Sequence, residues 1–311
     1  MKPVLAPALL MLVLSTAVGC GGPLPPPDPP NLAEAKDSLS KGNYWYGRGC
    51  YREAERFFQG GLDSARLSDD VLLIIRAQNS LGAAALAQGE LPAAAHYLEQ
   101  ALNIAVGHAG QPELDKIFGN LGSLAFKLKQ EKDAEDFWRQ ALETAEKNQS
   151  SPAPYYCNLA RLYLKNGRPE FAETSALALE AARLATDKGV LADALNLAGH
   201  EAQAAGQAAL AEERYLEALE LDRKIENTNG LAQDTEDLGR LMLAEKRYPE
   251  ASGYLDRAFF LWLALGEKSR AEEVFRELQK TSKEHQFPKS LSAYQAARRD
   301  PAAYLLLNQC P

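Results

Sequence analysis

The sequence predicts an all-α protein, an α-solenoid built from helix–turn–helix repeats. Three observations lead to this prediction: an internal repeat, an apolar stripe of helical spacing in the repeat copies, and no alternating pattern typical of β-strands. The chain has 311 residues, of which 46% are hydrophobic and 24% are charged. This composition is that of a globular chain with enough apolar residues to build an extended core.

The internal repeat consists of a small residue followed by an alanine twelve positions later, in six copies. The small residues are Gly42, Gly82, Gly122, Ala160, Gly199 and Gly239. The alanines are Ala54, Ala94, Ala134, Ala172, Ala211 and Ala251. Successive small residues are 40, 40, 38, 39 and 40 positions apart. A fixed offset that recurs six times indicates one supersecondary unit repeated along the chain.

Each copy is predicted to contain two helices joined by a turn. Apolar residues follow the alanine at the fourth, seventh and eighth positions, as in Ala134, Trp138 and Leu142, and this spacing marks one face of a helix. The fourth copy is irregular, because Glu180 occupies a position of this stripe. Small residues allow two helices to cross closely. Glycines mark the turns before the second helices: Gly49, Gly89, Gly167 and Gly206.

The first 31 residues are predicted to be a signal peptide (1–19) and a tether (20–31). Lys2, an apolar run from residue 4 to residue 14 and small residues before Cys20 are typical of secretion, and the run is too short to span a bilayer. Ala17-Val18-Gly19-Cys20 resembles a bacterial lipobox. The resemblance implies that Cys20 is lipidated and, because Gly21 follows it, that the anchor lies in the outer membrane. An ordinary signal peptide is the alternative.

The repeats are assigned to residues 32–266, and residues 267–311 to a degenerate seventh repeat that caps the array. Asn31, with Glu34 three residues later, is expected to start the first helix. A new stripe and a short helix over residues 290–299 would cover the apolar second helix of the sixth copy. The alternative is that this helix exposes a patch for self-association. The stripe comprises Ala271, Val274, Phe275 and Leu278, and the residues to be covered are Phe260, Leu261 and Leu263.

Cys50, Cys157 and Cys310 form neither a disulfide framework nor a metal-binding spacing. We expect them to be small buried hydrophobic residues or free thiols. Cys50 lies in the first repeat and Cys157 in the fourth, at least ~25 Å apart if helix layers are stacked. A disulfide requires Cα atoms within about 7 Å, so these two should not pair.

Charge and motifs exclude several classes of function. The net charge is −8, which argues against binding to a nucleic-acid backbone. The four histidines form no paired ligand spacing, and the chain has no phosphate-binding loop and no nucleophile motif. We therefore predict a protein that is not an enzyme and that has no metal and no cofactor.

The repeat units resemble the tetratricopeptide repeat (TPR). Gly49-Cys50-Tyr51-Arg52-Glu53-Ala54 matches its Gly-x-Tyr-x-x-Ala turn, and Leu81-Gly82 and Leu121-Gly122 match its Leu-Gly pair. The resemblance covers roughly residues 32 to 265. The period near 40, rather than 34, is similar to that of the kinesin light chain repeats. The resemblance implies a right-handed solenoid whose first helices line a concave groove.

The resemblance also implies which residues point into that groove, about two positions before each small residue. An asparagine there can pair with the backbone amides of an extended peptide. The alternative is that each asparagine bonds within its own helix turn. Arg161 and Arg240 would add positive charge on the same side. The asparagines are Asn79, Asn120, Asn158 and Asn196.

These observations favour a lipid-anchored periplasmic TPR adaptor, facing the periplasm from the outer membrane of a bacterial envelope. Its partner would be a protein or an extended peptide, with the membrane bound through Cys20 and no nucleic acid involved. The alternatives are a pilotin-like assembly factor for a secretin or pilus system and a self-associating structural lipoprotein. We expect a monomer unless the apolar sixth copy drives self-association.

Overall fold

The computed structural model describes residues 27–285, except 109 and 111, together with residues 294, 295, 297 and 299. This part of the chain contains thirteen α-helices and no β-strand, which confirms the predicted α-solenoid. Cys20 and the signal peptide lie outside it. The helices are α1 (Pro30–Gly47), α2 (Tyr51–Leu67), α3 (Val71–Gln88), α4 (Leu91–Gly107), α5 (Leu114–Lys127), α6 (Glu131–Asn148), α7 (Ala153–Lys165), α8 (Glu170–Leu184), α9 (Lys188–Ala204), α10 (Ala208–Ile225), α11 (Thr228–Ala244), α12 (Tyr248–Ala264) and α13 (Lys268–His285).

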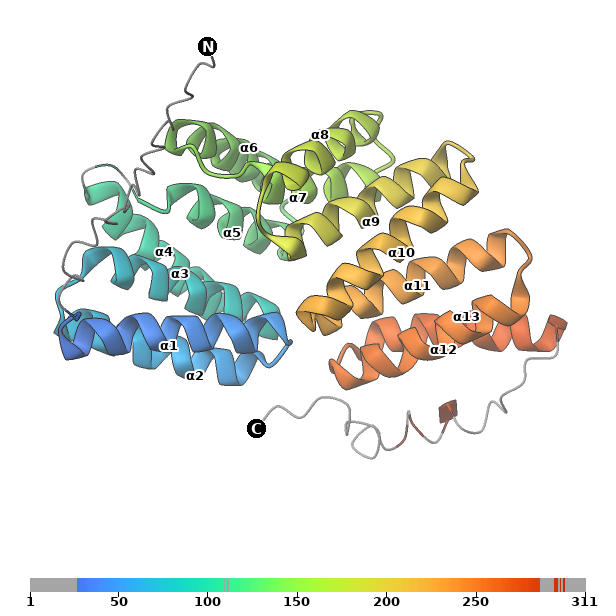
Figure 1. The fold of residues 1–311 in the computed structure, drawn as a ribbon, viewed down its shortest axis with the longest axis horizontal. Coiled ribbons are helices and arrows are strands. Elements are labelled where there is room, and N and C mark those ends of the chain that lie inside the picture. Colours follow the sequence, from blue (N-terminus) through green and yellow to red (C-terminus); the bar gives the residue numbers. More distant parts are fainter. Residues whose placement is uncertain are drawn as a thin grey trace, which may run out of the picture.

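Each odd-numbered helix from α1 to α11 packs most extensively against the even-numbered helix that follows it, and α13 packs against α12. These helical pairs follow one another along a curved path, and the last pairs return towards the first (Figure 1). Contacts between neighbouring odd-numbered helices, such as α3 with α5 and α7 with α9, connect one pair to the next. The array therefore has an inner layer of odd-numbered helices and an outer layer of even-numbered ones.

The packing within a pair depends on a missing side chain at the repeat glycine. A Cβ atom on Gly122 would lie 2.5 Å from Nε1 of Trp138, and one on Gly199 would lie 2.4 Å from Cε1 of Tyr215. The same contact, always with the residue sixteen positions later, recurs in five copies. The pairs are Gly42–Phe58, Gly82–Leu98, Gly122–Trp138, Gly199–Tyr215 and Gly239–Leu255. The large side chain of the second helix thus lies directly on the backbone of the first.

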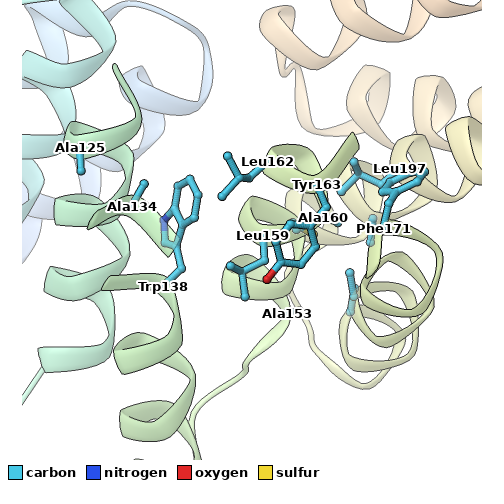
Figure 2. Close-up of a cluster of buried hydrophobic side chains, with 14 residues drawn as sticks. Ala125, Ala134, Trp138, Ala153, Leu159, Ala160, Leu162, Tyr163, Phe171 and Leu197 are labelled. Atoms are coloured by element: carbon cyan, nitrogen blue, oxygen red, sulfur yellow. The ribbon is translucent and has the colours of Figure 1, made fainter. Parts of the chain in front are cut away.

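The fourth copy departs from the predicted alignment by one residue. Ala172, expected in the buried stripe, is exposed, whereas Phe171 is buried. Glu180 lies on the exposed face, so it does not interrupt the stripe as the sequence suggested. Figure 2 shows Phe171 in one apolar cluster with Ala160 and Tyr163. The buried face of α8 continues through Ser175, Ala178 and Ala182.

This shift arises in the turn between α7 and α8. In the third copy the N–H of Ala134 bonds to the carbonyl of Gln130, four residues earlier, at 2.9 Å. In the fourth copy the N–H of Phe171 bonds to Arg168, three residues earlier, at 3.2 Å. Pro169 precedes α8 and has no N–H to donate. The first buried residue of α8 therefore comes eleven positions after the small residue Ala160 instead of twelve, although residues 166–169 separate α7 from α8.

The predicted turn glycines adopt the backbone conformation that favours glycine. Gly49 and Gly89 both have φ of 78°, and Gly167 and Gly206 have φ of 60° and 73°. In the third and sixth copies a lysine replaces the glycine at this position and still adopts a positive φ, 63° at Lys129 and 62° at Lys246.

The first helix begins at Pro30 and not at the predicted Asn31 cap. Its N-cap is Pro29, no side chain caps it, and Asn31 lies inside the first turn. Proline is favoured at the first helical position because its fixed φ suits the helix and its missing N–H would be unpaired there anyway.

The first repeat closes the array by meeting the fifth and sixth repeats. Arg48, after α1, forms an ion pair with Glu226, after α10. The side chain of Leu265, after α12, lies 3.1 Å from where a Cβ on Gly49 would be. The hydroxyl of Tyr51 bonds to the side chain of Asn229. The odd-numbered helices therefore surround a central space rather than an open groove.

The apolar sixth pair is covered by the C-terminal segment. Phe259, Trp262 and Leu263 of α12 are at most 5% exposed, and α13 packs against them. Tyr294 joins this cluster, with its ring centroid 5.3 Å from that of Phe259. Of the residues expected to be covered, Leu263 is buried, whereas Phe260 and Leu261 are partly buried against the same cluster. This packing favours the interpretation that the C-terminal segment covers the helix. The residues of α13 in the cluster are the predicted ones: Ala271, Val274, Phe275 and Leu278.

The cysteines follow one expectation and contradict another. Cys157 is a buried free thiol, and burial raises its pKa to about 12, which makes it a poor nucleophile. Cys50 is disulfide-bonded, with a partner outside the described residues, so the expectation that it is unpaired is wrong. The odd cysteine count argued against a framework, but a single bridge needs only two cysteines. Cys50 and Cys157 do not pair, as predicted.

The glycine contact predicts opposite effects of the same substitution at two helical positions. Gly122→Ala should destabilise the protein by about 1–3 kcal/mol, because the new methyl group would collide with Trp138. Gly60→Ala, in α2 with nothing within 4 Å of the added Cβ, should stabilise it by about 0.5–1 kcal/mol. Urea unfolding of the two variants beside the parent measures both, and equal effects would contradict the packing argument.

Candidate functional site

The space inside the closed array is a cavity of about 1,600 Å³. Its walls come from α1, the start of α2, α5, α7, α9, α10, α11 and α13, together with the turns after α1, α8 and α10. A smaller hollow of about 460 Å³ lies among α1, α3 and α5. Asn43 lines both, so the two hollows adjoin. The concave side thus offers one continuous polar surface at the centre of the molecule.

The predicted groove residues divide between these hollows and the surface beside them. Asn79 lines the smaller hollow, and Arg161 and Asn196 line the cavity. Asn120, Asn158 and Arg240 lie on the same odd-numbered helices but are not lining residues of either. The sequence therefore identified the correct layer of helices, while the binding role of each residue stays a prediction.

Four of these residues connect one odd-numbered helix to the next. Asn120 donates to Asn79 Oδ1 at 2.9 Å, which links α5 to α3. The guanidinium of Arg240 bonds to Glu277 at 3.0 Å and links α11 to α13. Asn196 links α9 to α11 by donating to two aspartates. These side chains are already hydrogen-bonded within the protein, and the connections hold adjacent repeats at a fixed angle.

Basic residues form the wall of the cavity contributed by α5 and α7. Lys127 is exposed, and Lys165 pairs with Glu131 at 2.8 Å while lying over the ring of Phe126. Arg161 lies 3.5 Å from Asp193 of α9. Because these ion pairs are partly exposed, their cationic groups can exchange partners at small cost. This wall can therefore interact with acidic or carbonyl groups of a ligand.

Next to this basic wall, α9, α10 and α11 carry buried carboxylates, of which Asp222 and Asp234 line the cavity and Asp237 lies beside them. Asp237 is 3% exposed and accepts hydrogen bonds from Asn196 at 2.9 Å and Gln233 at 2.7 Å. His200 lies 3.2 Å from the same carboxylate. Although burial raises its pKa, the charge of His200 and these donors leave the pKa of Asp237 below its usual value. Asp237 is thus a satisfied, ionised carboxylate.

Asp234, one helical turn earlier, is in the opposite state. Its Oδ1 accepts a hydrogen bond from Asn196 at 2.9 Å, but its Oδ2 is buried and receives none. The side chain is 1% exposed, and burial together with the nearby Asp222 carboxylate raises the pKa of Asp234. Helix α11 therefore carries one aspartate whose pKa is lowered and, one turn earlier, another whose pKa is raised.

Asp222 completes this group from the end of α10. It is 2% exposed and accepts a hydrogen bond from Asn227 at 2.9 Å. Burial raises the pKa of Asp222, and the charge of Asp193 adds to the effect. A Cβ on Gly230 would lie 1.7 Å from Asp222 Oδ2, so only glycine leaves room for this carboxylate against α11.

The sequence analysis did not identify Asp222, Asp234 and Asp237, because it considered only asparagines and arginines at the concave positions. Asp237 stands two residues before Gly239, the position of Asn120 and Asn158 relative to their own small residues. A search for carboxylates at that position would have found it. Asp222 and Asp234 carry no such signal, since they come together only when α10 packs against α11.

Two features bear on other classes of function. In the described ranges, no set of three or more His, Cys, Asp and Glu side chains is placed to hold a metal ion. Over the same ranges, the helices are all too short or too polar to cross a membrane.

Comparison with known proteins identifies the repeat. The tetratricopeptide repeat profile matches residues 74–111, the second helical pair. No curated protein matches the chain. The profile match and the α-solenoid together support a TPR protein.

Solved structures share the TPR-type fold at low sequence identity. Aspartyl phosphate phosphatase F from Bacillus subtilis superposes with a TM-score of 0.59 at 14% identity, over 86% of this chain and 70% of that one. A signal-transduction ATPase with a tetratricopeptide repeat sensor from Pyrococcus horikoshii gives 0.55 at 17%, over 87% and 46%. NprR in complex with its cognate peptide NprX gives 0.54 at 15%, over 88% and 81%. These likenesses establish the fold alone.

The raised pKa of Asp234 predicts a loss of stability as the pH rises. The folded state holds a proton that the unfolded chain releases above about pH 4, so this group's contribution falls with increasing pH. Asp234→Asn, which keeps a neutral group there, should melt at the same temperature as the parent only below about pH 4, where the unfolded chain also holds the proton. Near about pH 9 it should melt at least about 5 °C higher.

Differential scanning calorimetry across this pH range checks the prediction, with Asp133→Asn on the exposed face of α6 as the control. The control should differ from the parent by the same amount at every pH. A constant difference for Asp234→Asn as well would show that Asp234 has an ordinary pKa in the folded protein.

Proposed function

We propose that this protein is a non-catalytic adaptor that binds an extended segment of another protein in its central cavity. The contacts of Arg48 with Glu226 and of Gly49 with Leu265 close the array, and this observation carries the proposal. A closed ring leaves no room on its concave side for a folded domain, whereas an extended chain can enter. The cavity of about 1,600 Å³ offers such a chain both cationic donors and carboxylate acceptors among its lining residues.

A solved structure of similar fold that contains a bound peptide supports this proposal. NprR has been solved with its cognate peptide NprX, and it shares this architecture over 88% of the present chain. Extended peptides bind largely through backbone hydrogen bonds, so a cavity rich in amide and charged side chains suits them. The partner class is therefore a peptide or an extended protein segment.

We further propose that the adaptor is anchored by a lipid on Cys20 to the outer membrane of a bacterial envelope and faces the periplasm. The support is the lipobox-like Ala17-Val18-Gly19-Cys20 and the proline-rich residues that follow. At about 3.1 Å per residue, an extended proline-rich tether of this length keeps the repeats up to ~30 Å from the anchor.

The cavity proposal predicts where a partner can be captured. A photo-crosslinking residue at Lys127, which is exposed and lines the cavity, should capture the partner in cells. The same residue at Asn103, exposed on the outer helix α4, should not. Mass spectrometry of the crosslinked peptides should place Lys127 against one short segment of the partner. Capture by Asn103 alone, or by both equally, would contradict binding in the cavity.

A double variant on α7 tests the predicted groove residues with little effect on stability. Asn158 and Arg161 bond to each other at 3.2 Å, and the partly exposed Arg161–Asp193 pair contributes at most about 1 kcal/mol. Asn158→Ala with Arg161→Ala should keep the melting temperature and weaken partner binding at least about tenfold. Asn103→Ala is the matched control, and unchanged affinity of the α7 variant would remove these two residues from the site.

The anchor proposal predicts the fate of Cys20→Ser. The parent should incorporate labelled fatty acid and fractionate with the outer membrane, whereas the variant should do neither. Because Cys20 precedes the repeats, the variant should unfold at the same temperature as a soluble form that begins at Asp28. Fractionation of unlabelled Cys20→Ser with the membrane would show that another part of the protein holds it there.

A further inference from the structure

The ring is closed at a narrow seam, which we define as the place where the turn after α1 meets the turns after α10 and α12. Within the described ranges, the first helical pair shares no extended packing with the helices from α10 onwards, so the contacts across the seam come from turns and helix ends. One is a partly exposed ion pair and another a single hydrogen bond, and both kinds of contact contribute little to stability. The contacts join Arg48 to Glu226, Tyr51 to Asn229 and Gly49 to Leu265.

Cys50 lies in this seam and is disulfide-bonded. It is 5% exposed and lines a hollow of about 500 Å³ that spans the first repeat, the end of α3 and the turn after α12. The chain has four cysteines, and Cys157 is a buried free thiol. The partner of Cys50 within the chain is therefore Cys20 or Cys310.

Chain length favours Cys310. Thirteen residues separate it from Ala297, which is buried against α12, and an extended chain of that length reaches ~43 Å. Helix α12 has 17 residues and is therefore only ~26 Å long, and the turn that follows it meets the seam at Leu265. The segment after Ala297 can therefore reach Cys50 without being fully extended.

Cys20 is placed less favourably. It precedes Pro30, the first residue of α1, by ten positions, whereas Cys50 follows the far end of that helix. A proline-rich chain of this length spans ~31 Å at most, hardly more than the ~27 Å length of α1. The sulfur of Cys20 is also the atom that the proposed lipid would occupy.

We propose that Cys310 is the partner of Cys50, and that this disulfide cross-links the first repeat to the C-terminal segment and holds the ring closed. The hollow beside Cys50 then receives residues 300–311 of this chain, which include the apolar run from Tyr304 to Leu307. Since Ala297 is packed on α12, the bond connects the first repeat to the sixth. The inference rests on the proposed periplasmic location, because disulfides form and persist in oxidising compartments.

The cross-link makes closure of the ring depend on the redox state. A dithiol reductant attacks one sulfur of the bond, forms a mixed disulfide and leaves as its own disulfide, so two electrons and two protons pass to Cys50 and Cys310. Only the noncovalent contacts of the seam then remain. While the bond is intact, a protein segment enters the cavity through an open end of the ring. After reduction, the seam can part and admit the segment from the side.

Peptide mapping identifies the bond directly. Full-length protein from the bacterial envelope is unfolded in the presence of an alkylating agent and digested with trypsin without reduction. We expect peptide 49–52 to be linked to peptide 300–311, and peptide 148–161, which contains Cys157, to be alkylated. A link between 49–52 and the peptide that contains Cys20 would overturn both this cross-link and the lipid anchor. An alkylated, unlinked 49–52 would overturn the cross-link alone.

Thermal unfolding tests whether Cys50 and Cys310 act as one unit. Cys310→Ser should melt at least about 5 °C below the parent, because it removes a bond that closes a long loop. The double variant with Cys50→Ser should melt at the same temperature as Cys50→Ser alone, since the bond is already lost. Cys157→Ser is the control, and its effect should add to that of Cys310→Ser. Additive losses at Cys50 and Cys310 would show that they share no bond.

Charge reversal at the seam tests whether the bond holds the ring closed. Arg48→Glu places a second negative charge beside Glu226. Small-angle X-ray scattering should give the parent's radius of gyration for Arg48→Glu and for Cys310→Ser, and a larger radius only for the two combined. A cooperative melting transition shows that the combined variant is folded.

Two results of the scattering experiment would contradict the proposal. Expansion of Arg48→Glu with its disulfide intact would show that the bond does not hold the seam. An unchanged radius in the combined variant would show that other contacts keep the ring closed. Neither result depends on a partner, so partner capture at Lys127 tests the proposed function separately.

Discussion

The close crossing of two helices over a glycine is the contact on which the whole array depends. In five repeats a large side chain of the second helix lies on the backbone of the first, closer than any Cβ would allow. This contact sets the distance and angle within each helical pair. Since the pairs stack in sequence, small differences in that angle accumulate along the chain. The curvature that brings the first repeat to the sixth is the sum of these local geometries.

The fourth repeat shows how the contact can be replaced without losing the fold. Ala160 takes the place of the glycine. Phe171 takes the position of the buried alanine, and its N–H bonds three residues back instead of four. The large residue and the small one have exchanged places, because Ser175 now stands where the other copies have Phe, Leu, Trp or Tyr. The volume between the helices is filled in both arrangements, which is what a close-packed interior requires.

The polar residues of the inner layer line the central space and also connect neighbouring helices. Asn120, Asn196 and Arg240 connect neighbouring odd-numbered helices through hydrogen bonds, so they hold the ring in shape. The inner layer is therefore held together largely by hydrogen bonds between its own side chains.

The sequence alone determined the helical class, the six small repeat residues and the turns, because each of these depends on residues close together in the chain. The layer of helices that faces inwards came from the resemblance to the tetratricopeptide repeat. The sequence placed the buried stripe of the fourth repeat one residue too late, because that position depends on a hydrogen bond in the turn. It also led us to expect an unpaired Cys50, because a disulfide depends on a second cysteine elsewhere in the chain. Only the tertiary structure decided that the ring is closed, through Arg48 and Glu226. It alone also brought Asp222 and Asp234 together, because burial and proximity across two helices change a carboxylate's proton affinity and leave no trace in its local sequence.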